Sequence, residues 1–275
     1  MIEYRKPSPA SGRSVRRIAV AAVGLVALLA VSGAAQAAEV HVMISGGFTA
    51  AYQGLAPGFE KATGNKTSVA FGASMGTTPT AIPIRLARGE PDDVVIMVGY
   101  ALDDLIKAGL VVPGSKVELG VAHTVLAVKA GAPKPDISTV DALKHTLLTA
   151  KSIGYSDSAS GVYLSKELFP KLGVADQIRG KAKQIDGTPV GLNVASGDVQ
   201  IGFQQLSEMM TVPGIDIVGP LPPGADYAVV YAAGVATNAK EPQAARALIA
   251  YLASPAAAEM VRKSGMELPG APAAR

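Results

Sequence analysis

The 275-residue chain contains no cysteine and no tryptophan, and aromatic residues make up only 5% of it. The absence of cysteine excludes disulfide bonds, thiolate metal sites and thiol nucleophiles. Charged residues account for 17% and hydrophobic residues for 49%, a composition too apolar for a disordered protein. The length therefore suits one large or two modest domains with a substantial core.

The chain also lacks a strong excess of either charge once its first 37 residues are set apart. The formal net charge is +3, but residues 1–37 carry five basic residues and one acidic residue, which leaves 20 basic and 21 acidic residues in the remainder. A nearly neutral body offers no electrostatic basis for binding nucleic acid or an anionic membrane. We therefore expect no nucleic-acid partner.

Residues 1–37 have the pattern of a secretory signal peptide. A basic stretch ends at Arg17, an apolar run follows over residues 18–31, and Ala35-Gln36-Ala37 offers small residues for cleavage. The apolar run is shorter than the ~20 residues of a membrane-spanning helix. The pattern predicts cleavage after Ala37 and a periplasmic protein with no stable membrane contact. Arg16-Arg17 also leaves the twin-arginine export route open.

Apolar strands alternate with helical stretches along the rest of the chain, which favours an α/β architecture. The pattern restarts near Thr124, and residues 220–224 form a proline-rich segment typical of a crossing between domains. These features predict two lobes joined by two crossings. The first lobe comprises residues 38–120 and 221–275, and the second comprises residues 121–220.

Three loops of small residues each follow a predicted strand and precede a predicted helix. Small residues let backbone N–H groups approach a ligand, a helix N-terminus favours negative charge, and hydroxyl groups add donors. Any one loop could be an ordinary helix cap, but three together, beyond the carboxyl ends of strands, predict a site for an oxyanion or a polycarboxylate. The loops are Ser45-Gly46-Gly47, Ser74-Met75-Gly76-Thr77 and residues 156–161, which include Ser156, Ser158 and Ser160.

Two arginines follow the second loop. Arg85 and Arg88 lie three residues apart and therefore share a helical face. A guanidinium group can bind a carboxylate through two parallel hydrogen bonds, so both are candidate ligands, with an ordinary exposed helix surface as the alternative.

Metal and cofactor signatures are missing from the sequence. The three histidines have no metal-site spacing, and Gly46-Gly47 lacks the third glycine of a dinucleotide-binding fingerprint. The sequence therefore predicts no metal and no cofactor.

The order of the three loops resembles the periplasmic molybdate-binding family of type II solute-binding proteins over roughly the whole chain after residue 37. In that family, serines after the first strand and in the second loop bind the oxyanion, and Ser45 and Ser74 stand in those places. Gln205 stands where the molybdate-binding members have a ligand tyrosine, so this position departs from the family pattern. The resemblance implies a two-lobe α/β fold of the periplasmic-binding-protein type II, with the ligand cleft between the lobes.

Longer runs resemble the aconitate isomerases, exported enzymes built on the same fold. This resemblance implies interconversion of cis- and trans-aconitate, a tricarboxylate, by an allylic proton shift without a cofactor. Tyr155, His123 and Asp157 have suitable chemistry to carry the proton, and the choice among them is open. The alternative function is a solute-binding protein that delivers an oxyanion or organic acid to an ABC permease. The runs include Pro79-Thr80-Ala81-Ile82-Pro83, residues 155–165 and Gly202-Phe203-Gln204-Gln205-Leu206-Ser207-Glu208.

Overall fold

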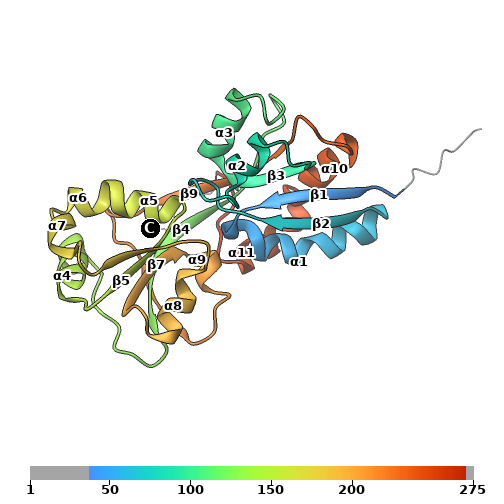
Figure 1. The fold of residues 1–275 in the computed structure, drawn as a ribbon. Helices are drawn as coiled ribbons and strands as arrows, with labels where there is room; N and C mark the ends of the chain where they lie inside the picture. The colour runs from blue at the N-terminus through green and yellow to red at the C-terminus, as the bar shows by residue number, and fades with distance from the viewer. Residues whose placement is uncertain (1–36, 271–275) are drawn as a thin grey trace, which may run out of the picture. The chain divides into compact units, whose positions relative to one another are not determined.

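The computed structural model describes residues 37–270, which form a mixed α/β protein (Figure 1). The predicted α/β architecture is therefore confirmed. The predicted signal peptide lies outside the described residues, except for Ala37. Within residues 37–270, no helix combines the length and the hydropathy that a membrane span requires.

The first part of the sheet is built around β1 (Glu39–Ile44), which pairs in parallel with β2 (Lys66–Phe71) and with β3 (Val94–Val98). β9 (Ala228–Val235) pairs antiparallel with β3. Every residue of β3 is buried, as is typical of a central strand that is covered on both faces. The helices of this part are α1 (Gly46–Thr63), α2 (Ile82–Ala87), α3 (Gly99–Lys107), α10 (Pro242–Leu252) and α11 (Ala258–Lys263).

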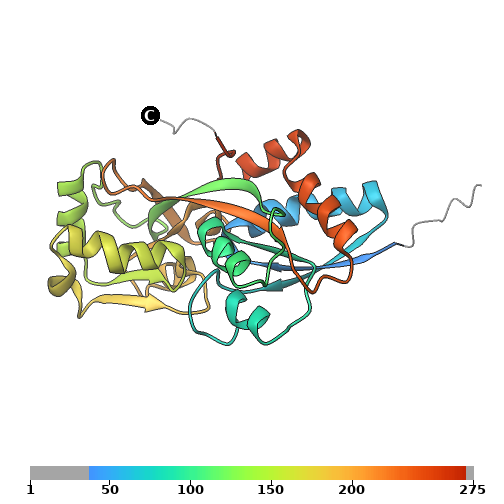
Figure 2. The ribbon, with the colours of Figure 1, turned by 90° about the horizontal axis from the view of Figure 1, so that it is seen from above.

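The long strand β4 (Val117–Lys129) joins this part to the second one. Its first half pairs with β9 as far as His123, and from Thr124 onward it pairs with β7 (Ile201–Gln205) and β8 (Ile215–Pro220). Figure 2 shows β4 and β9 running side by side between the two parts. The strands thus form one path, in the order β2-β1-β3-β9-β4-β7-β5-β6, with β8 on β4.

The second part of the sheet adds β5 (Ile153–Ser156), which pairs in parallel with β7 and with β6 (Ala182–Ile185). A π-helical turn at Leu164–Leu168 joins α5 to α6. The helices of this part are α4 (Val140–Thr149), α5 (Ala159–Tyr163), α6 (Phe169–Lys171), α7 (Ala175–Ile178), α8 (Val190–Ser196) and α9 (Leu206–Met209).

Buried apolar side chains gather in three clusters that follow this division. The largest surrounds β1, β3 and β9 and includes Phe48 and Phe59. The two others pack on the opposite faces of the second part, around Leu126 and Phe203 on one face and around Val125 and Val194 on the other. The predicted lobe limits, at residues 120/121 and 220/221, fall on β4 and at the end of β8, and these limits stay a prediction.

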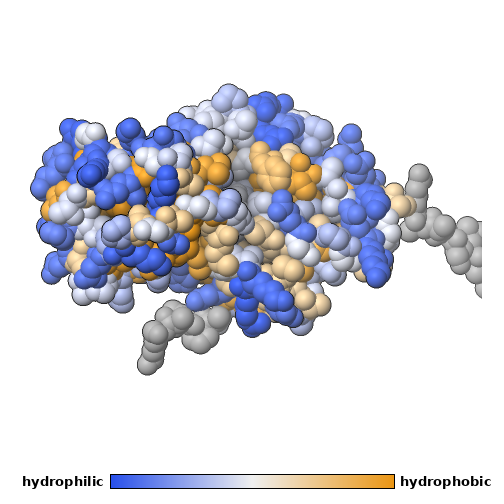
Figure 3. Space-filling model, turned by 90° about the horizontal axis from the view of Figure 1, so that it is seen from below, coloured by the Kyte–Doolittle hydropathy of each residue, from blue (hydrophilic) through white to orange (hydrophobic). Residues whose placement is uncertain are grey.

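One face of the molecule is mainly hydrophilic, with separate apolar patches over both parts (Figure 3). Apolar atoms contribute much of the exposed surface of folded proteins, so such patches do not by themselves mark a docking site.

Candidate functional site

The first site feature is a pair of serine hydroxyl groups at the carboxyl ends of two neighbouring strands. Ser45 follows β1 and Ser74 follows β2, and the Ser74 hydroxyl donates a hydrogen bond of 2.8 Å to Ser45 Oγ. Ser74 Oγ in turn accepts a hydrogen bond of 3.1 Å from the backbone N–H of Val98. Since a hydroxyl carries one proton, Ser74 uses its own on Ser45. The Ser45 proton has no acceptor within residues 37–270.

Ser45 does not act as an ordinary helix cap, although it stands at the N-cap position of α1. Its side chain makes no capping hydrogen bond to the helix. The hydroxyl group is thus held beside the start of an 18-residue helix, where partial positive charge favours an anion.

A second polar cluster lies at the carboxyl ends of β5 and β7. Ser156 Oγ and Ser160 Oγ are 3.0 Å apart, and the Ser160 hydroxyl donates to Gln205 Oε1 at 3.2 Å. All three side chains are buried. Gln205 Nε2 has no hydrogen-bond partner within the described residues. A buried donor without an acceptor costs about 1–3 kcal/mol, so this amide group is a strong candidate for contact with a ligand.

Contacts bring these loops together. A Cβ atom placed on Gly46 would overlap the carboxylate of Glu208, which follows β7, so only glycine allows this approach. A Cβ atom on Gly47 would likewise overlap the ring of Tyr231. On the other side, a Cβ on Gly76 would lie 3.9 Å from the backbone oxygen of Asp157. The loops after β1, β2, β5 and β7 are therefore neighbours.

Glu208, on α9, is a site residue that sequence reasoning missed. Gln204 Nε2 donates to Glu208 Oε1 at 2.9 Å, while Gln204 Oε1 accepts from the backbone N–H of Val190 at 2.8 Å. Burial raises the pKa of Glu208 to about 7. The hydrogen bond from Gln204 lowers this pKa and the charge of Asp157 raises it, and both effects are smaller than that of burial. The residue ends the run 202–208 noted above, but a glutamate on a short helix carries no recognisable motif.

Tyrosines that the sequence reasoning also missed surround the second loop. The Tyr100 hydroxyl lies 3.7 Å from Met75 Sδ, and the Tyr227 hydroxyl donates to Tyr100 at 3.4 Å. The Tyr227 ring stacks on Tyr163 with 4.2 Å between the centroids. Met75 is thus linked through Tyr100 to Tyr227, which directly precedes β9. Thr77 is exposed.

The three proton-transfer candidates from the sequence lie in different surroundings. Burial raises the pKa of the Tyr155 hydroxyl, whose ring meets Phe169 edge-on. Burial also raises the pKa of Asp157, which accepts a hydrogen bond of 3.2 Å from the backbone N–H of Gly187. The ring nitrogens of His123 face two carboxylates outside the three loops, Asp226 at 3.4 Å and Glu267 at 3.5 Å. Ser158 is the N-cap residue of α5, and its backbone N–H donates to Ser156 Oγ at 3.4 Å.

The two arginines have an internal partner, Glu90. Arg85 donates to Glu90 through Nε, at 2.9 Å, and through Nη2, and it also donates to the Phe71 carbonyl. Arg88 donates to Glu90 at 3.0 Å and to the Pro79 carbonyl at 2.7 Å. The Arg85 hydrogen bond lowers the pKa of Glu90 to about 2. Within residues 37–270, no hydrogen bond joins either guanidinium group to a serine of the three loops, although the Phe71 and Pro79 carbonyls that they bind flank the second loop.

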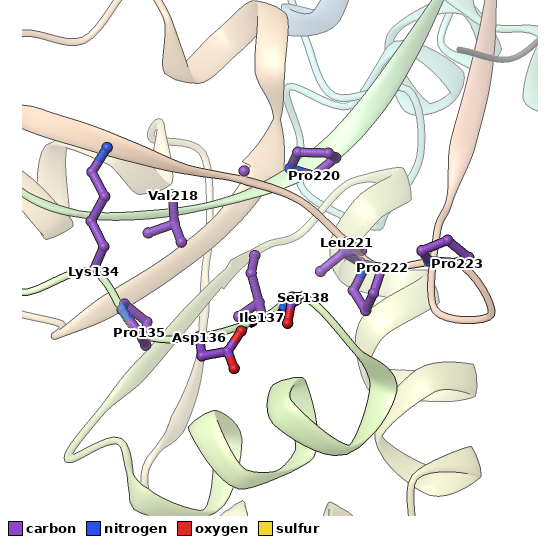
Figure 4. Close-up of a pocket in the computed structure, with 11 residues that line it drawn as sticks. Lys134, Pro135, Asp136, Ile137, Ser138, Val218, Pro220, Leu221, Pro222 and Pro223 are labelled. Carbon is purple, nitrogen blue, oxygen red and sulfur yellow. Dashed lines mark hydrogen bonds between the residues drawn. The ribbon is translucent and has the colours of Figure 1, made fainter. Parts of the chain in front are cut away.

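A separate pocket of about 480 Å³ lies in the second part of the molecule (Figure 4). Two segments line it, residues 134–138 and residues 218–223, and none of its lining residues belongs to the three loops. The Lys134 ammonium group is held by the Ile217 carbonyl at 2.8 Å. This pocket is therefore distinct from the cluster of hydroxyl and amide groups.

In this α/β sheet, hydroxyl and amide donors lie in the loops at the carboxyl ends of the strands. This arrangement is typical of proteins that bind small solutes. The model of the bacterial extracellular solute-binding protein family matches residues 40–267, and the chain belongs to this family. The fold is the two-lobe type II fold of the periplasmic binding proteins, so the predicted fold class is confirmed.

Similar proteins include an enzyme and a binding protein. The chain is 51% identical to aconitate isomerase of Pseudomonas sp over 226 residues, which cover 82% of this chain and 86% of that protein. It is 30% identical over 250 residues to the molybdate-binding protein ModA of Azotobacter vinelandii, covering 86% and 92%. The solved structure of the periplasmic molybdate-binding protein of Azotobacter vinelandii matches with a TM-score of 0.67 at 20% identity, covering 84% of this chain and 99% of that one.

Proposed function

We propose that this protein interconverts cis- and trans-aconitate by an allylic proton shift. The observation that carries this proposal is the 51% identity to aconitate isomerase of Pseudomonas sp, which extends over 82% of the chain.

The arrangement of polar groups fits a tricarboxylate substrate. The Ser45 hydroxyl, with its proton unused, and the buried amide of Gln205 are separate donors contributed by the two parts of the sheet. Preorganised donors of this kind stabilise negative charge that spreads over the allylic system once a methylene proton has been removed. The other loop residues, Ser156, Ser158 and Ser160, complete the proposed binding site.

We place the protein in the periplasm, with residues 1–37 as a cleaved signal peptide. The family to which the chain belongs is extracellular, and the chain resembles a periplasmic molybdate-binding protein in fold. The basic and apolar pattern of residues 1–37 supports the same location. Mass spectrometry of the exported protein should find Ala38 as its first residue, and a retained Arg17 would contradict the proposal.

A second candidate function is delivery of an oxyanion or organic acid to an ABC permease. The observation in its favour is the 30% identity to the molybdate-binding protein ModA. Such a role needs the same donors and a closing motion but no base.

One incubation separates the two functions. Purified protein is mixed with cis-aconitate, and trans-aconitate is followed by proton NMR. An isomerase reaches the same ratio of isomers from either starting compound. Saturable binding of aconitate without conversion would contradict the isomerase proposal and favour the delivery role.

A further inference from the structure

We propose that Glu208 is the base that carries the proton between the two ends of the allylic system. This inference rests on the proposed isomerase function. It adds a residue that lies outside the three serine loops and that no sequence motif identifies.

The position of Glu208 is the first argument. The residue lies on α9, just beyond the carboxyl end of β7, and α9 packs against α1. Its carboxylate fills the space above Gly46 that any larger residue would occupy. Gly46 directly follows Ser45, whose hydroxyl proton is unused. The carboxylate is thus held against the loop that carries a candidate substrate donor.

The orientation of the carboxylate is the second argument. Gln204 is fixed by the Val190 N–H on one side and donates to Glu208 Oε1 on the other. Glu208 Oε2 accepts no hydrogen bond within the described residues, and the residue is half-buried. One oxygen therefore anchors the group while the other is free to meet a methylene proton.

The pKa of Glu208 agrees with the role that its position suggests. Burial raises the pKa of Glu208 to about 7, which suits a group that must first accept and then return a proton near neutral pH. The titratable groups that act on it are Asp157, whose charge raises this pKa further, and Tyr231, whose own pKa is raised by burial and by Glu208.

The other candidates are less suited to this role. The raised pKa of Tyr155 keeps its hydroxyl protonated at neutral pH, so it cannot accept a proton there. Asp157 is like Glu208 in having a pKa raised by burial and one oxygen held by a hydrogen bond, but its carboxylate is held at Gly187 rather than against Gly46, the neighbour of Ser45. Both ring nitrogens of His123 face carboxylates of the segments around β4 rather than the serine pair.

The step balances without any co-reactant. Ionised Glu208 takes a proton from the methylene carbon, and the C–H electron pair forms a new double bond to the central carbon. The electrons of the former double bond move to its far carbon and the attached carboxylate. Neutral Glu208 then returns the proton to that far carbon, so the product is an isomer of the substrate.

The test is the Glu208→Gln variant, whose amide oxygen can still accept the hydrogen bond from Gln204. We expect kcat to fall at least a hundredfold, since general acid–base catalysis typically contributes about 10²–10⁴-fold. The Kd for aconitate, measured by calorimetry, should change less than fivefold. We expect the wild type to catalyse exchange of the methylene protons in D₂O, and this exchange should disappear in the variant. The matched control is Glu259→Gln, at an exposed position of α11, which should retain full activity.

Different outcomes overturn different claims. If the wild type isomerises aconitate and Glu208→Gln keeps more than a tenth of its kcat, Glu208 is not the base and the isomerase function stands. Loss of binding together with activity would make Glu208 a substrate-positioning residue and would also overturn the proposal. A wild type that binds aconitate without converting it overturns both claims. Should Glu208→Gln fail to fold, the Glu208→Asp variant decides, because an unchanged midpoint in its pH–rate profile would exclude Glu208.

Discussion

Two carboxyl groups of this protein, Asp92 and Glu208, keep their protons up to about neutral pH for the same main reason. Burial raises the pKa of each to about 7. Their places in the fold differ, however. Asp92 lies just before the amino end of β3, near the Arg85–Glu90 pair, whereas Glu208 lies beyond the carboxyl end of β7, beside Gly46 and close to Ser45.

A raised pKa can reflect burial alone, as at Asp92, or burial beside a candidate binding site, as at Glu208. At Asp92 the raised pKa accompanies a buried oxygen that has no hydrogen-bond partner within the described residues, near the Arg85–Glu90 pair. At Glu208 it accompanies an oxygen without a hydrogen bond, on a carboxylate that lies against the loop of Ser45, at the edge of the sheet where α/β proteins bind ligands. A perturbed proton affinity therefore indicates burial, and only its position relative to other groups indicates chemistry.

The largest expected effect concerns stability at Asp92. Because its folded-state pKa is about 7 and its ordinary value is 3.8, the native state binds more protons between these values, so the free energy of unfolding falls as pH rises from about 4 to 7. The difference corresponds to at most roughly 4 kcal/mol. Asp92→Asn should therefore be more stable than the wild type at pH 8 by up to that amount, and nearly equal to it at pH 4, in urea denaturation.

The neighbouring Asp93 provides the control for this experiment. Its carboxylate accepts hydrogen bonds from the backbone N–H groups of His41, Lys240 and Glu241 at 2.7–2.8 Å. Asp93→Asn should destabilise the protein at pH 8. An Asp92→Asn variant that is also less stable at pH 8 would show that burial of the ionised Asp92 carboxylate does not destabilise the folded state.

The next effect is on the pH–rate profile. A base with a pKa of about 7 must lose its proton to act, so kcat/KM should rise about tenfold per pH unit below 7, which is roughly a hundredfold between pH 5 and 7. Asp92→Asn should leave the midpoint of this profile in place. A midpoint that moves with Asp92→Asn would show that Asp92, and not Glu208 alone, controls the pH dependence of catalysis.

A smaller effect is expected at the serine pair. Ser45→Ala removes the hydroxyl whose proton is unused, and loss of a hydrogen bond to a charged ligand group costs about 1.5–3 kcal/mol, which is roughly ten- to a hundredfold in the Kd for aconitate. Ser74→Ala should instead also lower stability, by about 1–3 kcal/mol, because it leaves the buried N–H of Val98 without an acceptor. Calorimetric titration and thermal melting of both variants check this contrast.

The smallest effect is expected at Arg85. Its side chain is only 13% exposed and bridges Glu90 and the Phe71 carbonyl, so Arg85→Gln should cost about 1–2 kcal/mol of stability. The Kd for aconitate should change less than threefold, because the guanidinium is already bound to Glu90 and to the Phe71 carbonyl. A Kd raised tenfold or more would support Arg85 as a substrate ligand.

Local patterns made much of this fold predictable. Short apolar runs followed by small residues identified the strands and the loops around Ser45, Ser74 and Ser156, because both signals lie within a few residues of each other. The sequence could not show that Arg85 is bound to Glu90, since an arginine that binds a substrate and one that binds a neighbouring glutamate have the same local pattern. Nor could it show Glu208 against Gly46, because this contact joins distant segments through the packing of α9 on α1.

The pairing of β4 also constrains the order in which the molecule can form during synthesis. The strands β4 to β8 form a contiguous stretch of chain, with two apolar clusters of their own. The other part of the sheet needs β9, from near the C-terminus, to cover β3 and the first half of β4. While a nascent chain still lacks β9, the edges of β3 and β4 that later pair with β9 stay unpaired. Exposed strand edges of this kind are prone to aggregation. The middle of the chain can therefore fold first, and the N-terminal strands depend on the last quarter of the chain for their protection.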